Sequence, residues 1–218
     1  MSKQSKSTPG TCFQCGKSAL KTAMKNHVLK SHNDGDELCY LIKAEGMHDK
    51  NYWLLFSLPL STTLAALDKF LRQIWCECCG HLSAFWRDGH QLGETRKVST
   101  LSIGDKLQYE YDFGSTTEIL LTVLDEISRP KQREKVCLLA RNNPHGQTCD
   151  TCGAPATATN AWEFELLCEQ CCSKAQDEAA VLPIVNSPRC GVCGYTGEQD
   201  RWTSPNSTLP LGPEKVVK

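Results

Sequence analysis

The order of hydrophobic and polar residues predicts a sheet of short strands with one amphipathic helix. The apolar run at 52–58 is short enough for a buried strand, and Pro59 closes it. A helix should follow, with Ser61 or Thr62 as its cap. Its apolar positions recur at helical spacing along one face: Leu64, Leu67, Phe70, Leu71 and Ile74. Residues 82–86 predict a further strand.

The clearest strand pair lies within residues 106–124. Apolar and polar residues alternate from Leu107 to Phe113, and the turn follows at Gly114. Residues 118–124 are more uniformly apolar, which predicts a central strand covered on both faces. Residues 135–140 predict another strand. Four or more strands around one helix indicate a small, antiparallel-rich α+β domain.

Changes in composition divide the chain into segments. They are a disordered arm (1–10), a zinc finger (11–33), a polar linker (34–47), the main α+β domain (48–200) with a zinc ribbon inserted at 149–172, and a flexible tail (201–218). Because the finger would carry its own metal core, we expect the main domain to survive removal of residues 1–37.

Composition identifies the cysteines as the informative residues. There are 14 of them in 218 residues, and the formal net charge is only −1. No apolar stretch follows the N-terminal lysines, and the longest apolar run, 52–60, is far short of the roughly 20 residues of a membrane span. We therefore expect a cytoplasmic protein without a membrane segment, in which reduced thiols hold metal.

The first group of candidate ligands is Cys12, Cys15, His27 and His32, nearly the spacing of a Cys2His2 zinc finger. Two thiolates separated by two residues can face one ion, and two histidines about a turn apart on a helix lie on the same side. Met24 occupies the usual apolar position. The usual aromatic residue after the second cysteine is missing, so Ala19 or Leu20 should fill that space.

The second group is Cys149, Cys152, Cys168 and Cys171. Two CxxC pairs at this distance are typical of a zinc ribbon. Four thiolates would complete the tetrahedron and leave no position open for water, so this zinc should be structural. Cys172 could replace Cys171. A redox motif is the competing interpretation, but it requires only one CxxC at the start of a helix.

The third group is Cys79, His81, Cys190 and Cys193. Cys76 has knuckle spacing with Cys79, Cys78 is adjacent, and His81 could replace any one of the thiolates. The alternative is that these cysteines are small buried hydrophobic residues in tight turns, as free cysteines often are. Core packing is also the expected role of Cys39 and Cys137, which have no nearby partner.

Four segments together resemble the plasmid pRiA open-reading-frame-three-like family. They are Ser57-Leu-Pro59, Cys78-Cys-Gly-His-Leu-Ser-Ala-Phe85, the stretch from Gly104 to Gly114 that ends in Tyr-Asp-Phe-Gly, and Asn186 to Tyr195. The resemblance spans roughly residues 52–197 and implies an α+β domain, found mainly in bacteria and archaea, with no established reaction. Many members carry acidic residues and a Trp after Tyr-Asp-Phe-Gly, whereas residues 115–118 differ here. The chain looks like a Cys-rich branch, and the resemblance strengthens the third group.

Several catalytic classes lack their motifs. Asp112-Phe-Gly114 is not accompanied by a kinase phosphate loop or catalytic segment, and Cys190-Gly-Val-Cys193 is not accompanied by the His-x-Glu of zinc deaminases. HExxH, the P-loop and GxGxxG are also missing. The sequence therefore favours a non-enzymatic role.

The sequence predicts a zinc-binding interaction or adaptor protein with a protein partner and about two or three structural zinc ions. One alternative is weak nucleic-acid binding through residues 1–32, whose lysines at 17, 21, 25 and 30 would form a stripe on a helix. The other is an enzyme with an open metal site near Cys79, His81 and Cys193.

Overall fold

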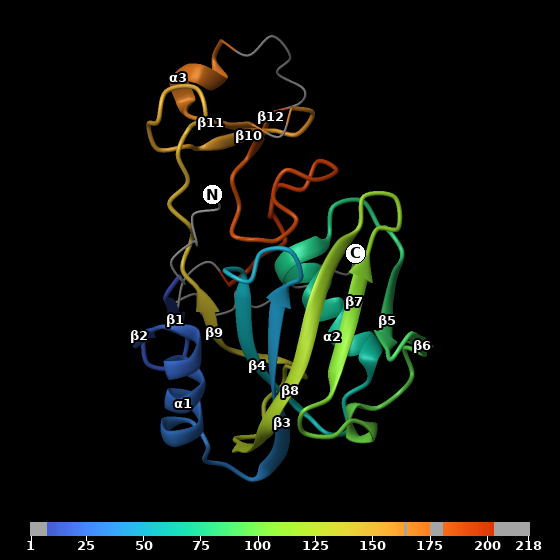
Figure 1. The fold of residues 1–218 in the computed structure, drawn as a ribbon. Helices are drawn as coiled ribbons and strands as arrows, with labels where there is room; N and C mark the ends of the chain where they lie inside the picture. Colours follow the sequence, from blue (N-terminus) through green and yellow to red (C-terminus); the bar gives the residue numbers. More distant parts are fainter. Residues whose placement is uncertain (1–7, 164, 175–180, 203–218) are drawn as a thin grey trace, which may run out of the picture.

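The computed structural model describes residues 8–163, 165–174 and 181–202, so the predictions for residues 1–7 and 203–218 lie outside the described residues. The largest unit is a nine-stranded antiparallel sheet in the order β2-β1-β9-β4-β3-β8-β7-β5-β6 (Figure 1). Its strands are β1 (Gly10–Cys12), β2 (Ser18–Ala19), β3 (Glu37–Gly46), β4 (Trp53–Pro59), β5 (Ser83–Arg87), β6 (His90–Leu92), β7 (Lys106–Tyr111), β8 (Thr117–Arg129) and β9 (Cys137–Asn142). Few helices accompany this sheet, which confirms the α+β class.

The remaining elements are short. They are the helices α1 (Lys21–Ser31), α2 (Leu64–Leu71) and α3 (Glu169–Cys172), a π-helical turn η1 (Arg72–Cys76), a 3-10 turn η2 (Val98–Thr100), and a small sheet of β10 (Ala158–Asn160), β11 (Glu165–Leu167) and β12 (Val181–Pro183). The predicted helix is α2, but its N-cap is Thr63 rather than Ser61 or Thr62, and Ile74 lies in η1.

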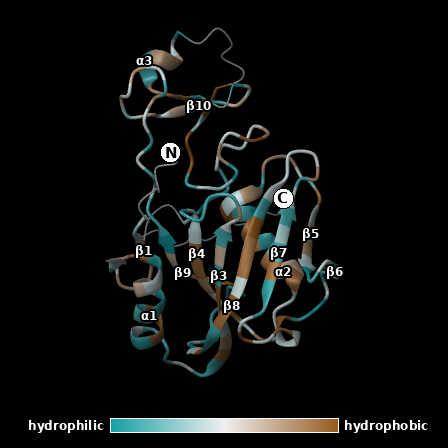
Figure 2. Ribbon diagram, in the orientation of Figure 1, coloured by the Kyte–Doolittle hydropathy of each residue, from teal (hydrophilic) through white to brown (hydrophobic). Residues whose placement is uncertain are grey.

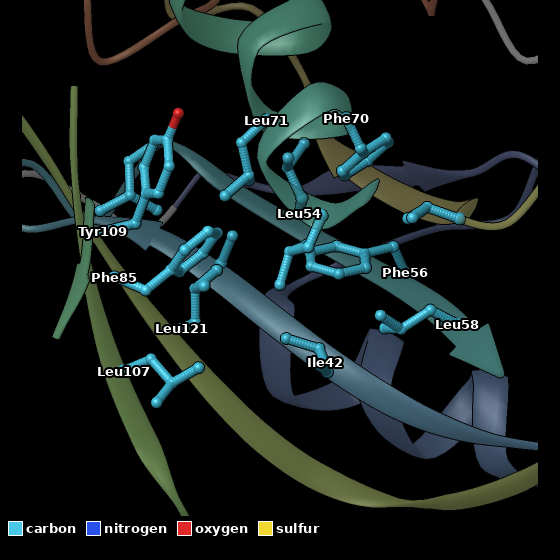
Figure 3. Close-up of a cluster of buried hydrophobic side chains, with 14 of the residues drawn as sticks. Ile42, Leu54, Phe56, Leu58, Phe70, Leu71, Phe85, Leu107, Tyr109 and Leu121 are labelled. Carbon is cyan, nitrogen blue, oxygen red and sulfur yellow. The ribbon is translucent and has the colours of Figure 1, made fainter. Parts of the chain in front are cut away.

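One face of the large sheet packs against α2 and η1. Leu54, Phe56 and Leu58 alternate along β4 toward this helix, and the rings of Phe56 and Phe70 lie 4.9 Å apart (Figure 3). Tyr109 from β7 joins the same cluster. Alternation in the sequence predicts only the β7 part of this core, because every second residue of a strand faces the same way.

The opposite face is covered in part by α1. Met24 and Val28 of this helix are fully buried in a cluster with Leu41 of β3 and with Trp53 and Leu55 of β4. The strand β4 therefore lies between two layers, which explains why its sequence is continuously apolar. Figure 2 shows how few apolar positions the short helix α1 carries by comparison.

The predicted linker at 34–47 is wrong over most of its length. Its residues 37–46 form β3, which pairs with β4 on one side and with β8 on the other. The strand was missed because Lys43 and Glu45 interrupt its apolar pattern. Glu45 is nevertheless buried, because it forms ion pairs with Lys43 at 2.6 Å and with Lys21 of α1.

The finger is not a separate domain, contrary to the predicted boundary at residue 33. Its first strand, β1, pairs with β9 and thereby extends the large sheet. Gly10, predicted to be part of a disordered arm, allows this approach: a Cβ there would lie 2.3 Å from the carbonyl oxygen of Arg141. Arg129 of β8 also donates hydrogen bonds to the His32 carbonyl at 3.0 Å and to Gln14 at 3.1 Å. The finger and the sheet share one core.

Two smaller differences concern β8 and the C-terminal boundary. Burial alternates along β8 from Thr117 to Val123, so residues 118–124 are not covered on both faces as predicted. Trp202, assigned to the flexible tail, packs against Phe70 with ring centroids 5.3 Å apart. Whether the second face of β8 is covered, and whether Trp202 packs against Phe70, both depend on residues far away in the sequence. Local sequence patterns do not show such contacts.

Candidate metal centres

Three groups of four side chains converge. We name them the N-terminal site (Cys12, Cys15, His27, His32), the central site (Cys78, Cys79, His81, Cys193) and the ribbon site (Cys149, Cys152, Cys168, Cys171). In each group the four potential ligand atoms lie within 4.8 Å of one another. These groups could hold metal ions, and their thiolate and imidazole donors are those that zinc prefers.

The separations of the ligand atoms fit a tetrahedral ion. Zinc–sulfur bonds of about 2.3 Å place two sulfurs roughly 3.7 Å apart around one ion. The Sγ atoms of Cys152 and Cys168 lie 3.6 Å apart, and those of Cys79 and Cys193 lie 3.9 Å apart. Disulfide sulfurs would be separated by about 2.05 Å. The spacing is therefore that of shared ligation rather than of oxidation.

The N-terminal site joins the turn after β1 to the end of α1. Cys12 Sγ lies 3.4 Å from His32 Nε2, Cys15 Sγ lies 3.1 Å from His27 Nε2, and the two Nε2 atoms are 3.2 Å apart. The N–H of Gly16 donates to the Cys12 carbonyl at 2.8 Å, which closes the knuckle. All four predicted ligands meet here.

The surroundings of this site favour neutral imidazoles. Burial lowers the pKa of both histidines, and the positive charges of Lys17 near His27 and of Arg129 near His32 lower it further. Neutral imidazole is the form that binds metal. Ala19, rather than the half-exposed Leu20, packs against the adjoining core and fills the space predicted for one of them.

The ribbon site also brings together its four predicted ligands. The N–H of Gly153 donates to the Cys149 carbonyl at 2.8 Å, repeating the knuckle of the N-terminal site. Cys168 precedes α3 and Cys171 lies within it, while Cys172 stays outside the group. Burial raises the pKa of Cys149, but backbone hydrogen bonds from Cys168, Cys152 and Thr151 outweigh it and bring the pKa to about 6. The thiolate form is thus favoured at Cys149, whereas neighbouring thiols raise the pKa of Cys171.

The central site differs from the prediction in one ligand. Cys78 belongs to it, with its Sγ 3.6 Å from that of Cys79, and Cys190 does not. The Cys190 Sγ instead accepts a hydrogen bond from the Val185 N–H at 3.4 Å. Cys76 is fully buried in the core. The knuckle spacing of Cys190 with Cys193 was therefore misleading.

The turn at Gly80 explains why two adjacent cysteines can serve one site. Its φ of 79° is left-handed, a conformation that favours glycine. This turn brings His81 Nε2 to 3.0 Å from Cys79 Sγ and to 3.2 Å from Cys193 Sγ. Glu77 holds the loop by accepting the Gly80 N–H at 2.7 Å. The Cys-Cys-Gly-His sequence was the signal that could have identified Cys78.

Two buried charged residues lie behind the central site. Arg189 donates to Asp112 at 2.7 Å and to the Cys78 Sγ at 3.6 Å. Burial raises the pKa of Asp112, but the hydrogen bonds from Arg189 and from the backbone of Ser115 and Gly114 outweigh it, so the net pKa is lowered. Neither residue is among the predicted ligands, although both lie in segments that carry the family resemblance.

The predicted lysine stripe on α1 is interrupted. Lys21 pairs with Glu45 and donates to the Lys50 carbonyl at 2.8 Å, so its charge is used inside the protein. Lys17 and Lys30 are exposed, and Lys25 is partly exposed. Fewer lysines are thus free for phosphates than the sequence suggests.

No family model and no curated protein sequence matches this chain. Among solved structures, it is similar to the crystal structure of the protein of unknown function MM3350 from Methanosarcina mazei Go1. The two share 16% identity with a TM-score of 0.43, and the match covers 54% of this chain and 75% of that chain. Within the described ranges, no helix is long and apolar enough to cross a membrane.

Proposed function

We propose that this chain is a zinc-binding interaction or adaptor protein, cytoplasmic and non-enzymatic, in which three zinc ions have structural roles. The observation that carries the proposal is that every candidate site has four protein ligands. A structural zinc site is closed by four protein ligands, whereas a catalytic site keeps a position open for water or substrate. Membership of the plasmid pRiA open-reading-frame-three-like family is a separate prediction, which this proposal does not require.

The surface next to the metal sites supports an interaction role. Leu82, which follows His81, is 74% exposed, and Phe113 is 53% exposed. A backbone hydrogen bond from the Asp112 N–H to the Leu82 carbonyl, at 2.9 Å, joins the two segments that carry these residues. On the ribbon, Trp162 is 70% exposed. Aromatic residues such as Phe113 and Trp162 are enriched at protein interfaces.

Two measurements distinguish this proposal from the enzyme alternative: the number of zinc ions per chain and the number of protein ligands on each ion. Native mass spectrometry should find three zinc ions per chain, and cobalt-substituted protein should show the spectrum of four-coordinate sites without a bound water. Two or fewer ions, or a cobalt site with exchangeable water, would contradict closed structural sites.

The interaction role needs its own test. Chemical cross-linking in cells, read by quantitative mass spectrometry, should identify partners of the intact chain that are lost in Leu82→Ser/Phe113→Ser or in Trp162→Ser, while all three zinc ions are retained. An unchanged set of cross-linked proteins in both variants would contradict the adaptor role. Nucleic acid among the cross-linked material would favour the alternative instead.

A further inference from the structure

A buried ion pair, Arg189 with Asp112, lies next to the central site and contacts its ligands. Arg189 is fully buried, and its guanidinium donates to Asp112 at 2.7 Å, to the Thr117 hydroxyl at 2.9 Å and to the Ser115 carbonyl at 3.1 Å. Burying a charge is costly unless it is paired and hydrogen-bonded. The same guanidinium also reaches the Cys78 Sγ, at 3.6 Å. A fully buried arginine thus contacts a candidate metal ligand.

The two carboxylate oxygens of Asp112 contact different groups: one faces Arg189 and the other faces His81 of the central site. Oδ2 accepts from Arg189, and Oδ1 lies 3.4 Å from His81 Nδ1. Oδ1 also accepts the Gly114 N–H at 3.1 Å, which fixes the carboxylate in the turn. Asp112 itself has a φ of 65°, a left-handed conformation that few non-glycine residues adopt. A strained turn that aims a carboxylate at a ligand is typical of functional geometry.

Charge balance gives the arrangement a chemical reason. One zinc ion with three thiolates and a neutral imidazole carries a net charge of about −1, Asp112 adds a second negative charge, and Arg189 offsets one of the two. Nε2 of His81 faces the cysteine sulfurs, so Nδ1 is free to carry the proton toward Asp112. Metal-bound histidines usually donate their second N–H to such a partner, which fixes the tautomer and orients the ring.

We propose that Asp112 and Arg189 are positioning residues for the metal ion of the central site. Asp112 holds His81 as the tautomer that binds through Nε2, and Arg189 stabilises the Cys78 thiolate. Because Arg189 and Cys193 lie on the same C-terminal segment, metal binding also fastens that segment to the turns that contain Cys78 and Asp112. This inference rests on the proposed structural zinc at the central site.

The other two sites lack this connection among the contacts described. Arg129, the buried cation beside the N-terminal site, donates to the His32 carbonyl and to the Gln14 side chain rather than to a ligand atom. The three sites also have different donor sets: two sulfurs with two nitrogens, three sulfurs with one nitrogen, and four sulfurs. Cadmium-113 NMR distinguishes such sets, so occupancy of each site can be measured separately.

Asp112→Asn tests the proposal on the full-length chain, and Asp200→Asn is its matched control. Asp200 also pairs with a buried arginine, Arg141, at 2.5 Å, but neither residue belongs to or contacts a metal site. In chelator competition, D112N should lower the metal affinity of the central site about 10- to 100-fold, whereas D200N should leave it unchanged. The cadmium signals of the other two sites should not move in either variant. Equal central-site affinities in D112N and wild type would overturn the proposal.

The same substitution in a variant that lacks the imidazole of His81 tests whether Asp112 acts through that ring. In His81→Cys the central site becomes four thiolates, and Asp112 has no imidazole to orient. There, adding D112N should weaken the site far less than it does in the wild-type background. An undiminished effect would mean that Asp112 acts only by supporting the fold.

One measurement needs no variant and therefore does not depend on folding of D112N. Long-range proton–nitrogen correlation in the zinc-loaded wild type should show His81 bound through Nε2 and protonated at Nδ1. Binding through Nδ1 would overturn the inference. Failure of the proposed function would look different, since the wild type would then give no cadmium signal for three sulfurs and one nitrogen.

Discussion

The N-terminal finger and the ribbon use the same knuckle and a comparable set of four ligands, but they differ in what surrounds the metal. The helix of the finger buries Met24 and Val28 against a nine-stranded sheet. Among its described residues, the ribbon has a small cluster around Leu167, made largely of its own cysteines. The first module is held mainly by packing, whereas the second would depend mainly on an ion bound at its four cysteines. A zinc motif in a sequence therefore does not reveal how far its fold depends on zinc.

The largest effect should follow from removing residues 1–33, which deletes β1, β2 and α1. Trp53, Leu55 and Leu139, all fully buried, would become exposed. We expect an insoluble chain, or one without a cooperative thermal transition, as measured by circular dichroism. A soluble fragment with a sharp transition would restore the sequence-based interpretation of the finger as a separate domain.

Cys152→Ser should unfold the ribbon while the large sheet persists. Structural zinc contributes on the order of 10 kcal/mol or more to folding, and the small ribbon core cannot replace it. Limited proteolysis should cut within residues 149–172, and native mass spectrometry should show one ion fewer. The matched control is Cys172→Ser, which lies outside the ligand group and should keep three ions. Equal protease resistance in the two variants would contradict the assignment.

Met24→Ala should destabilise the zinc-loaded protein by about 2–5 kcal/mol, because it leaves a cavity between α1 and the sheet. Leu20→Ala, at a 52% exposed position of the same module, should change the free energy of unfolding by less than about 0.5 kcal/mol. Urea denaturation of both variants in excess zinc measures the difference. Similar values for the two would mean that the finger does not depend on this packing.

The smallest effect concerns Glu45, whose ion pairs join α1 to β3. Burial raises its pKa, but Lys21 and Lys43 lower it more, so the net folded-state pKa lies below that of the unfolded chain. The stabilisation is present above the unfolded-state pKa and is lost as the pH falls through the folded-state pKa. Glu45→Gln should cost roughly 1 kcal/mol near neutral pH, and the difference from wild type should shrink in acid.

The two proteins are compared at each pH because metal loss in acid should affect both in the same way. Chemical denaturation at several pH values gives the difference in unfolding free energy. A difference that stays constant or grows as the pH falls would contradict the ion-pair explanation.

Local patterns of apolar and polar residues predicted elements such as β7, in which every buried residue is apolar. Residues 107–111 alternate in sequence and in burial, because β7 has one covered face. Residues 37–46 escaped prediction because the charges of Lys43 and Glu45 are neutralised by a helix far away in the sequence. Spacing alone selected the four residues that converge at the N-terminal site and those at the ribbon site, although it left Cys172 open in place of Cys171. It failed at Cys190 because its thiol contacts the Val185 N–H, a contact that knuckle spacing does not predict.

The pairing of β1 with β9 has a consequence for synthesis. The ribosome makes Cys12 long before Ala140, its partner in the sheet, and at ordinary elongation rates the interval is on the order of ten seconds. During that time β1 has no partner strand in the sheet, although β3 and β4, which α1 also contacts, are already made. Early capture of zinc by the four N-terminal ligands would keep the helix formed and its apolar residues gathered. The ion at this site would then matter most to the nascent chain, before the pairing of β1 with β9 that later joins the finger to the sheet.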